Sequence, residues 1–201
     1  MDTSSETQSE YMRDRIDNTM DFKKVLHFLS QDFKKYNISY GLIGGIALGA
    51  HGIIRATVDI DFLVKKDDLS TVKSIMEAHG YKSIYESENV SQYISDVSPF
   101  GAVDFLHAFR AISLSMLERA QAHTVFGGEL EISVLEPEDI IGLKVQALAN
   151  NPDRKELEYA DIKRVLEKFR RTLDWKRLKE YFILFGLENI FDEYEKKYRS
   201  E

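Results

Sequence analysis

The stretch that most constrains this chain is residues 40–65, which read YGLIGGIALGAHGIIRATVDIDFLVK. It places Asp59 and Asp61 one residue apart within a run of β-branched and apolar residues. Side chains of a β-strand alternate between its two faces, so the pattern predicts a strand with both acids on one face. The predicted acidic face contains Arg55, Thr57, Asp59 and Asp61, and the opposite face contains Val58, Ile60, Phe62 and Val64.

Neighbouring acids on one face of a strand repel each other, and Asp is a poor strand former. A divalent cation would offset this repulsion, and Mg²⁺ in particular binds carboxylate oxygens together with substrate phosphates. We therefore expect a metal site at Asp59 and Asp61. The alternative is a half-buried strand whose polar side faces water, because such strands also alternate.

A glycine pair precedes the acids. Gly44 and Gly45 follow the apolar residues Leu42 and Ile43, and the next residues favour a short helix. Glycine lets the backbone approach a ligand closely, and the first turn of a helix presents free N–H groups to anions. The pair therefore predicts a phosphate site, with an ordinary strand-to-helix turn as the alternative.

Together these motifs resemble the signature of the DNA polymerase β-like nucleotidyltransferase superfamily. The resemblance rests on residues 43–45 (IGG), a spacer of thirteen residues and residues 59–62 (DIDF). The superfamily has a third carboxylate between apolar residues on an adjacent strand, and Asp104 within residues 103–105 (VDF) fits this place. Gly45 departs from the Gly-Ser form common in the wider superfamily, so only backbone donors are expected there.

The second half resembles a branch of that superfamily, the AbiEii-like toxins. The matching elements are residues 143–148 (LKVQAL) and residues 160–162 (ADI), so the resemblance spans roughly residues 20 to 170. It implies an α/β (α+β) nucleotidyltransferase fold, with a small mixed sheet flanked by helices and a helical C-terminal part. It also implies that the 3′ end of tRNA or another RNA is the acceptor and that a separately encoded antitoxin is a partner.

Lys144 and Asp161 stand out without this resemblance. Lys144 lies on the apolar stripe of a helix opened by Pro137, where a lysine must reach the surface or meet an anion. Asp161 lies at the margin of the apolar face of the next predicted helix. For Asp161, a functional role and a structural salt bridge, either to Lys144 or to Arg164, are equally open; for Lys144 we favour function.

The resemblance implies a Mg²⁺-dependent transfer of a nucleoside monophosphate from an NTP to a hydroxyl, with Mn²⁺ as a possible substitute. Asp59 and Asp61 would hold two ions that bridge the triphosphate, and Asp104 would bind the ion that activates the acceptor. Gly44 and Gly45 would bind the phosphates, and Lys144 would neutralise their charge. The remaining expected contacts come from Arg55 and Thr57 on the acidic face and from Asp161, which would orient Lys144 or act as a base.

Two other functions remain open. One is transfer to a small molecule, as in antibiotic nucleotidyltransferases. The other is a non-catalytic module that senses nucleotides or binds a protein. The presence of all three carboxylates and Lys144 favours an enzyme.

The charge balance argues against a protein that coats nucleic acid, because the net charge is −7 and backbone binding depends on Lys and Arg. A local basic site is still possible at residues 164–179, which contain Arg164, Lys168, Arg170, Arg171, Lys176, Arg177 and Lys179. The chain has 201 residues, 43% hydrophobic content and no Cys, and its sequence predicts neither a signal peptide nor a membrane span. We therefore expect a cytoplasmic protein.

The chain is expected to have three parts: a flexible arm over residues 1–18, a nucleotidyltransferase core over 19–135 and a helical part over 136–201. Strands are predicted at 81–85, 92–96 and 102–108, and Gly127 with Gly128 predicts a hairpin turn. Asp67 and Asp68 are candidate caps of a helix that ends near Gly80. Four helices are predicted after residue 135, at 137–149, 156–169, 175–185 and 187–199, with their aromatic residues in the core.

Overall fold

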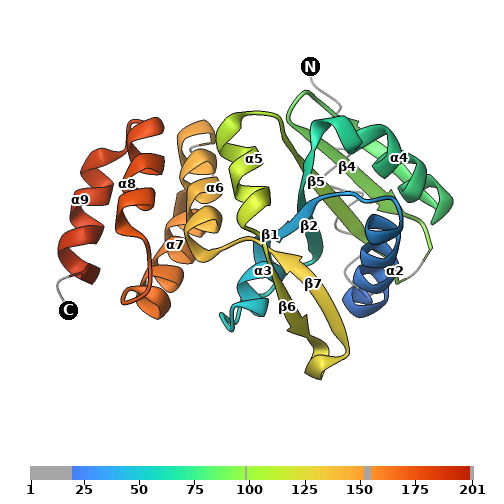
Figure 1. Ribbon diagram of the computed structural model, residues 1–201, viewed down its shortest axis with the longest axis horizontal. Helices are drawn as coiled ribbons and strands as arrows, with labels where there is room; N and C mark the ends of the chain where they lie inside the picture. The colour runs from blue at the N-terminus through green and yellow to red at the C-terminus, as the bar shows by residue number, and fades with distance from the viewer. Residues whose placement is uncertain (1–19, 98, 152–154, 200–201) are drawn as a thin grey trace, which may run out of the picture.

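The computed structural model describes residues 20–97, 99–151 and 155–199, so the arm predicted over 1–18 lies outside the described residues. A seven-stranded mixed sheet forms the centre of the molecule, in the order β3-β4-β5-β2-β1-β7-β6 (Figure 1). Its strands are β1 (Tyr40–Ile43), β2 (Asp59–Lys65), β3 (Tyr81–Glu86), β4 (Val90–Ser95), β5 (Ala102–Ala108), β6 (Gln121–Val125) and β7 (Leu130–Val134). The sheet confirms the predicted fold class.

The register of the central strands brings distant sequence positions together. Strand β1 pairs antiparallel with β2, and Ile43 lies opposite Asp61. Strand β2 pairs in parallel with β5, and Asp61 lies beside Asp104. The apolar residues that alternate with these acids, such as Phe62 and Phe105, are buried on the other face. This alternation turns the acids of two strands toward the same side of the sheet.

Helices α2 (Phe22–Lys35) and α4 (Leu69–Ala78) lie next to each other, and α2 packs on the apolar face, where Phe33 contacts the rings of Phe62 and Phe105. Helices α3 (Gly44–Ala50) and α5 (Ala111–Arg119) contact the central strands. At the end of α5, Ala120 approaches Gly41, which is paired with Leu63 two residues beyond Asp61. Helix α5 therefore packs on the same face of the sheet as the acids and lies beside them.

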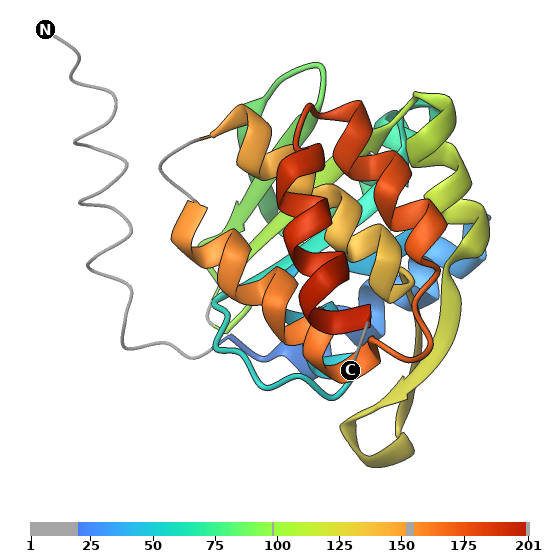
Figure 2. The ribbon, with the colours of Figure 1, turned by 90° about the vertical axis from the view of Figure 1, so that its left-hand side faces the viewer.

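The C-terminal helices follow the sheet as predicted and pack side by side (Figure 2). They are α6 (Pro137–Asn150), α7 (Lys155–Phe169), α8 (Trp175–Leu184) and α9 (Glu188–Tyr194), and α9 continues into a π-helical turn (Glu195–Arg199). Trp175, Phe182 and Phe191 are buried between them, which confirms the interpretation of these aromatic residues as core. None of the described helices has the length and apolar character that a membrane span requires.

An ionic network around a buried carboxylate joins the C-terminal helices α6 and α8 to α5. The Asp139 carboxylate in α6 is fully buried and accepts two hydrogen bonds from Arg119 in α5, at 2.9 and 3.1 Å. It also accepts a hydrogen bond from the Tyr181 hydroxyl in α8. Arg177, also in α8, lies 3.8 Å from the same carboxylate. Asp139 thereby connects α5, α6 and α8.

Three local predictions are corrected. Strand β2 begins at Asp59 rather than before Arg55, and Val58 is 82% exposed instead of lying on a buried face. Asp68 occupies the cap position of α4, but its backbone is helical (φ −90°, ψ −4°) and its side chain makes no cap hydrogen bond. A 3₁₀ turn (Lys66–Asp68) leads into this helix. Strand β4 begins at Val90, two residues earlier than predicted. The hairpin turn at Gly127 and Gly128 is confirmed.

Candidate active site

Three carboxylates converge on one face of the sheet. Asp59 and Asp61 come from β2 and Asp104 from the adjacent strand β5. Each offers an oxygen atom such that all three lie within 4.8 Å of one another. Only oxygen ligands are present in this cluster, and such a set suits a hard divalent cation. The structure thus brings together the three acids that the sequence singled out.

Two uncharged side chains orient the outer acids. The Thr57 hydroxyl donates to Oδ1 of Asp59 at 2.7 Å, and the Gln92 amide donates from Nε2 to Oδ2 of Asp104 at 2.7 Å. Thr57 lies in the segment before β2 rather than on a strand, yet it still contacts the acidic face. Gln92 was not predicted from sequence, because its relation to Asp104 depends on the pairing of β4 with β5.

The central acid, Asp61, has an altered affinity for protons. Burial, and secondarily the negative charges of Asp59 and Asp104, raise the pKa of Asp61 to about 7, against opposition from the positive charges of Arg55 and Lys144. Burial and the neighbouring acids both make the ionised form of Asp61 costly when no cation is present. The electrostatics of the cluster therefore favour the binding of a positive ion.

The glycine pair forms the predicted strand-to-helix turn. Gly44 has φ +66°, and a Cβ at this position would lie 1.9 Å from Oδ2 of Asp61. A Cβ at Gly45 would lie 2.5 Å from Cβ of Thr57 and 2.7 Å from Nη1 of Arg55. Both glycines are therefore required by the close approach of side chains from the acidic site and from the segment before β2.

We expect Gly44→Ala to destabilise the protein and to displace Asp61. The left-handed backbone conformation alone costs an alanine about 1–2 kcal/mol, and the clash with the carboxylate adds to this. Urea unfolding measures the loss of stability. Mg²⁺ titration measures the affinity for the ion, which should fall when Asp61 is displaced. Gly49→Ala is the matched control, because it lies in the same helix with no atom within 4 Å of the added Cβ. The control should raise the free energy of unfolding by about 0.5–1 kcal/mol. Equal effects of the two substitutions on stability would contradict this account.

A second charged cluster lies between α6 and α7, the first two C-terminal helices. Nζ of Lys144 in α6 lies 2.6 Å from Oδ2 of Asp161 and 2.9 Å from Oε2 of Glu158, both in α7. Asp161 is fully buried and also contacts Nε of Arg55 at 3.2 Å and Nη1 of Arg164 at 3.0 Å. The salt bridge expected as the structural alternative for Lys144 and Asp161 is therefore present. Because Arg55 also lies against Gly45, this cluster adjoins the acidic site.

Sequence reasoning missed Glu158 as a partner of Lys144. The signal was available, because Glu158 and Asp161 are three residues apart and such pairs share a helix face. The two carboxylates together hold one buried ammonium group.

The segment between α3 and β2 is fastened at its beginning. The Lys168 ammonium group in α7 donates to the carbonyl oxygen of Gly52 at 2.8 Å. His51, at the end of α3, contacts the carbonyl oxygen of Leu135 through Nε2 at 2.7 Å and packs edge-on against Phe169. Helix α7 therefore anchors the segment that carries Arg55 and Thr57.

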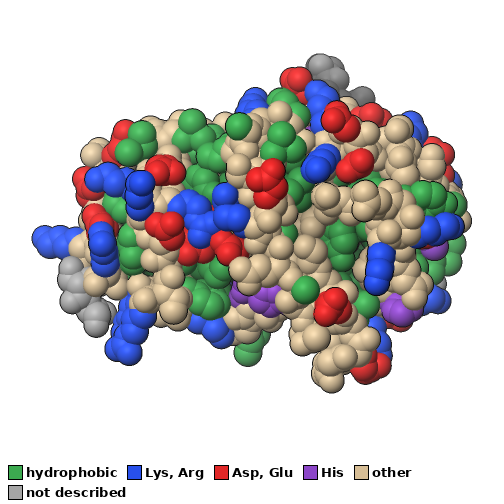
Figure 3. All heavy atoms as spheres, viewed as in Figure 1, with side chains coloured by type: hydrophobic (Ala, Val, Ile, Leu, Met, Phe, Trp, Pro, Cys, Tyr) green, Lys and Arg blue, Asp and Glu red, His purple; other side chains and the backbone are tan. Residues whose placement is uncertain are grey.

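Several members of the predicted basic group are engaged within the protein. Besides Arg164 and Lys168, Arg177 pairs with Glu136 at 2.6 Å, and Lys179 lies over the ring of Phe191. On the face shown in Figure 3, basic and acidic side chains are interspersed over the C-terminal helices. These residues therefore give little support to a continuous basic track.

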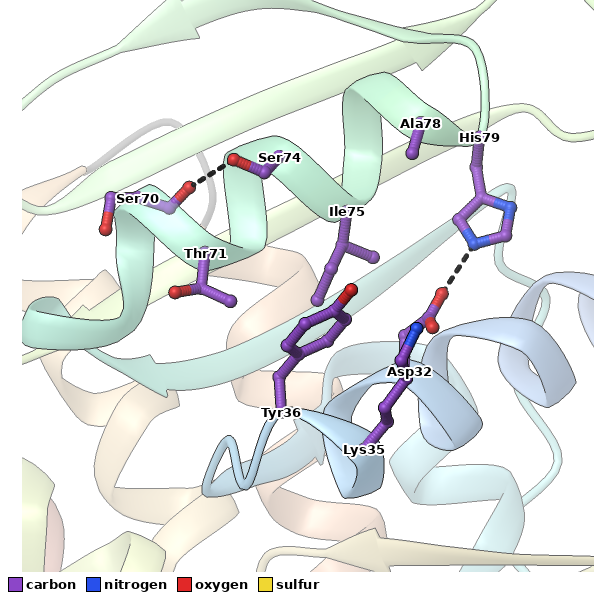
Figure 4. Close-up of a pocket in the computed structure, with 9 residues that line it drawn as sticks. All are labelled: Asp32, Lys35, Tyr36, Ser70, Thr71, Ser74, Ile75, Ala78 and His79. Atoms are coloured by element: carbon purple, nitrogen blue, oxygen red, sulfur yellow. Dashed lines mark hydrogen bonds and ion pairs between the residues drawn. The ribbon is translucent and has the colours of Figure 1, made fainter.

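A surface hollow between α2 and α4 is separate from the acidic site (Figure 4). Its lining includes Tyr36, Ser74 and Ile75, and Asp32 pairs there with His79 at 2.7 Å. Helix α2 packs on the apolar face of the sheet through Phe33, so the hollow and the carboxylates lie on opposite faces. No residue of the predicted site lines it.

Solved structures identify the class of fold. The antibiotic-resistance factor ANT(2″)-Ia is similar over 89% of this chain and 99% of its own, with 14% identity and a TM-score of 0.62. Its complex with adenylyl-2″-tobramycin gives 13% identity and a TM-score of 0.60 over 81% and 95% of the two chains. The lincosamide antibiotic adenylyltransferase LnuA, solved with lincomycin, gives 16% identity and a TM-score of 0.50 over 74% and 98%. The fold is that of nucleotidyltransferases.

The sequence comparison places the chain within this class. The chain belongs to the family described as uncharacterised nucleotidyltransferases, whose model matches residues 22–194. Among curated proteins, none is similar at a significant level. The protein is thus a nucleotidyltransferase, and the wider resemblance inferred from residues 43–45 and 59–62 is confirmed, whereas membership of the toxin branch stays a prediction.

Proposed function

We propose that the protein transfers a nucleoside monophosphate from an NTP to a hydroxyl acceptor. The acceptor oxygen forms a bond to the α-phosphorus, the bond from that phosphorus to the bridging oxygen breaks, and pyrophosphate leaves. The hydroxyl proton is released to solvent or a nearby base. The observation that carries this proposal is the convergence of Asp59, Asp61 and Asp104 within 4.8 Å.

The three acids fit Mg²⁺, because they supply only carboxylate oxygens and these oxygens converge within 4.8 Å of one another. Two such ions, when bound, would stabilise the attacking and leaving oxygens. Asp59 and Asp61 would hold them on the triphosphate side, and Asp104 on the acceptor side. Thr57 and Gln92 keep the outer carboxylates oriented.

Positive groups next to the acids would bind the triphosphate. Arg55 lies against Gly45, and Lys144 joins it through Asp161. In this assignment Asp161 and Glu158 orient Lys144, and the backbone at Gly44 and Gly45 donates to phosphate oxygens. Preorganised cations and N–H groups of this kind stabilise the charge that develops on a leaving pyrophosphate.

Two acceptors remain candidates. The resemblance to the toxin branch predicts an RNA or tRNA end, with an antitoxin as partner. A small hydroxylated molecule is supported by the similarity to ANT(2″)-Ia, solved with adenylyl-2″-tobramycin, and to LnuA, solved with lincomycin. It is also supported by the basic residues Arg164, Lys168 and Arg177, which contact other groups within the protein. We favour the small molecule, because an RNA backbone needs several available cations.

The test is transfer of label from each α-labelled NTP, with Mg²⁺ or EDTA, to tobramycin, lincomycin and total RNA. We expect Mg²⁺-dependent transfer by the wild type and none by a variant carrying Asp59→Asn. Nucleotide binding that is indifferent to EDTA, without transfer to any acceptor, would instead indicate a non-catalytic module. Label in RNA alone would reverse our preference for the acceptor.

A further inference from the structure

The acidic site continues along the sheet in one row of residues. Asp61 is paired with Asp104 across β2 and β5, Asp104 with Gln92 across β5 and β4, and Gln92 with Tyr85 across β4 and β3. Residues directly opposite each other in neighbouring strands direct their side chains to the same face. The acceptor row, as we call Asp104, Gln92 and Tyr85, therefore leads from the carboxylates to the edge of the sheet.

A β-bulge decides which residue ends the row. Ser83 pairs with Tyr93, but the next paired residue is Tyr85, opposite Gln92, because the register shifts between Ser83 and Tyr85. Regular pairing would have placed Ile84 opposite Gln92 instead. Bulges commonly re-aim a side chain at a sheet edge near an active site. Here the bulge puts an aromatic ring, whose residue is 49% exposed, in line with the acids.

The opposite side of the acids is already occupied by groups suited to phosphate. Gly44, which follows β1, lies against Asp61, and Arg55 lies against Gly45. Arg55 also contacts Asp161, so the Lys144 cluster adjoins this side of the acids. An in-line transfer needs the acceptor and the leaving pyrophosphate on opposite sides of the α-phosphorus. With the triphosphate on the β1 side, the acceptor must approach from the β5 side, where the acceptor row lies.

The side chains on this part of the sheet indicate the kind of acceptor. Val90, opposite Leu106, and Ile94, opposite Ala102, flank the row on the same face. Lys82, opposite Ile94, is basic, but it pairs with Asp96 at 2.8 Å. Tyr85 lies two strand spacings, or about 10 Å, from Asp104. This surface matches a ring compound of about that length better than a phosphate backbone.

We propose that the acceptor row binds a small hydroxylated ring compound that carries no phosphate, with its reactive hydroxyl at Asp104 and a ring against Tyr85. This inference rests on the proposed nucleotidyl transfer and extends it to the substrate. Gln92 acts as a positioning residue, because its amide holds Oδ2 of Asp104 and has a further donor and acceptor to offer the substrate. Tyr85 supplies affinity through its exposed ring.

The test uses α-labelled ATP with two acceptor pools from a cell extract: total RNA, and the filtrate that contains only small molecules. We expect label in the filtrate pool. Tyr85→Ala should raise the filtrate concentration that gives half-maximal transfer about tenfold, and Tyr85→Phe should leave it near the wild-type value. Gln92→Ala should lower the maximal rate about tenfold, with rescue by Gln92→Asn no more than partial. The two changes at Tyr85 should leave ATP binding in Mg²⁺ unaltered.

Tyr36→Ala is the matched control, because Tyr36 is also 49% exposed but lies in the hollow between α2 and α4. The inference is overturned if Tyr85→Ala and Gln92→Ala behave like Tyr36→Ala, or if label enters only RNA. If Mg²⁺-dependent ATP binding itself is absent, the proposed function fails, and the inference about the acceptor fails with it. Transfer that is intact in every variant would remove the acceptor row alone.

Discussion

Replacing Asp61 with Asn is expected to lower nucleotidyl transfer at least about a thousandfold and, at the same time, to stabilise the metal-free protein at pH 8. The loss follows from the central position of Asp61 in the carboxylate cluster. The gain follows from burial, which with the neighbouring acids raises the pKa of Asp61 to about 7. Initial-rate assays measure the first effect, and urea unfolding in EDTA measures the second.

The sign of the stability change follows from proton linkage. Between the ordinary pKa of an unfolded Asp, about 4, and the native value of about 7, the folded protein holds a proton that the unfolded chain releases. The wild type therefore loses stability as the pH rises through this window, by about 4 kcal/mol at most, whereas the Asn variant does not. The advantage of the variant should vanish below about pH 4.

Asp67→Asn serves as the control, because Asp67 is exposed and outside the cluster. It should leave both the transfer rate and the pH dependence of unfolding unchanged. An Asp61→Asn protein that is less stable than the wild type at pH 8 in EDTA would show that Asp61 is ionised and favourably paired in the native state. That outcome would remove the electrostatic argument for a cation at this site.

Replacing Asp139 with Ala is expected to cost about 3 kcal/mol of unfolding free energy. The change leaves Arg119 and Arg177 with no carboxylate at the centre of the network, and it leaves the Tyr181 hydroxyl without its acceptor. Breaking a buried ion pair on one side is costly because the remaining charge is still desolvated. Denaturant unfolding monitored through Trp175, which is buried in α8, measures the loss.

Two other variants define the size of this effect. Tyr181→Phe removes only the hydroxyl group and should cost about 1 kcal/mol. Asp192→Ala changes an exposed acid in α9 and should stay within about 0.5 kcal/mol of the wild type. A cost for Asp139→Ala no larger than that for Asp192→Ala would mean that apolar packing alone holds α6 and α8 in place.

Much of the candidate site could be predicted because it depends on local rules. The alternation of residues 59–62 placed Asp59 and Asp61 on one face, and a single glycine pair indicated the turn before α3. The C-terminal helices were evident from their apolar periodicity. Asp104 required the resemblance to a known superfamily, because nothing in residues 103–105 alone states that β5 lies beside β2.

The rest depends on contacts between segments distant in sequence. Gln92 meets Asp104 only because β4 pairs with β5 in one register, and Tyr85 joins them only because a bulge shifts β3. Arg55 and Thr57 were predicted on the acidic face for a reason that proved wrong. They belong to an irregular segment, and they reach the site because α7 and the glycine pair hold that segment against it.

The arrangement around Asp161 has a consequence for which substitutions this sequence can accept during evolution. One buried carboxylate receives cations from three separate segments, through Arg55, Lys144 and Arg164. A single substitution at the acid leaves three positive charges with Glu158 as the remaining acid of the cluster, and a single loss among the cations disturbs the other two. Changes at these positions should consequently be inherited in groups, so that descendants keep the whole set or replace it together.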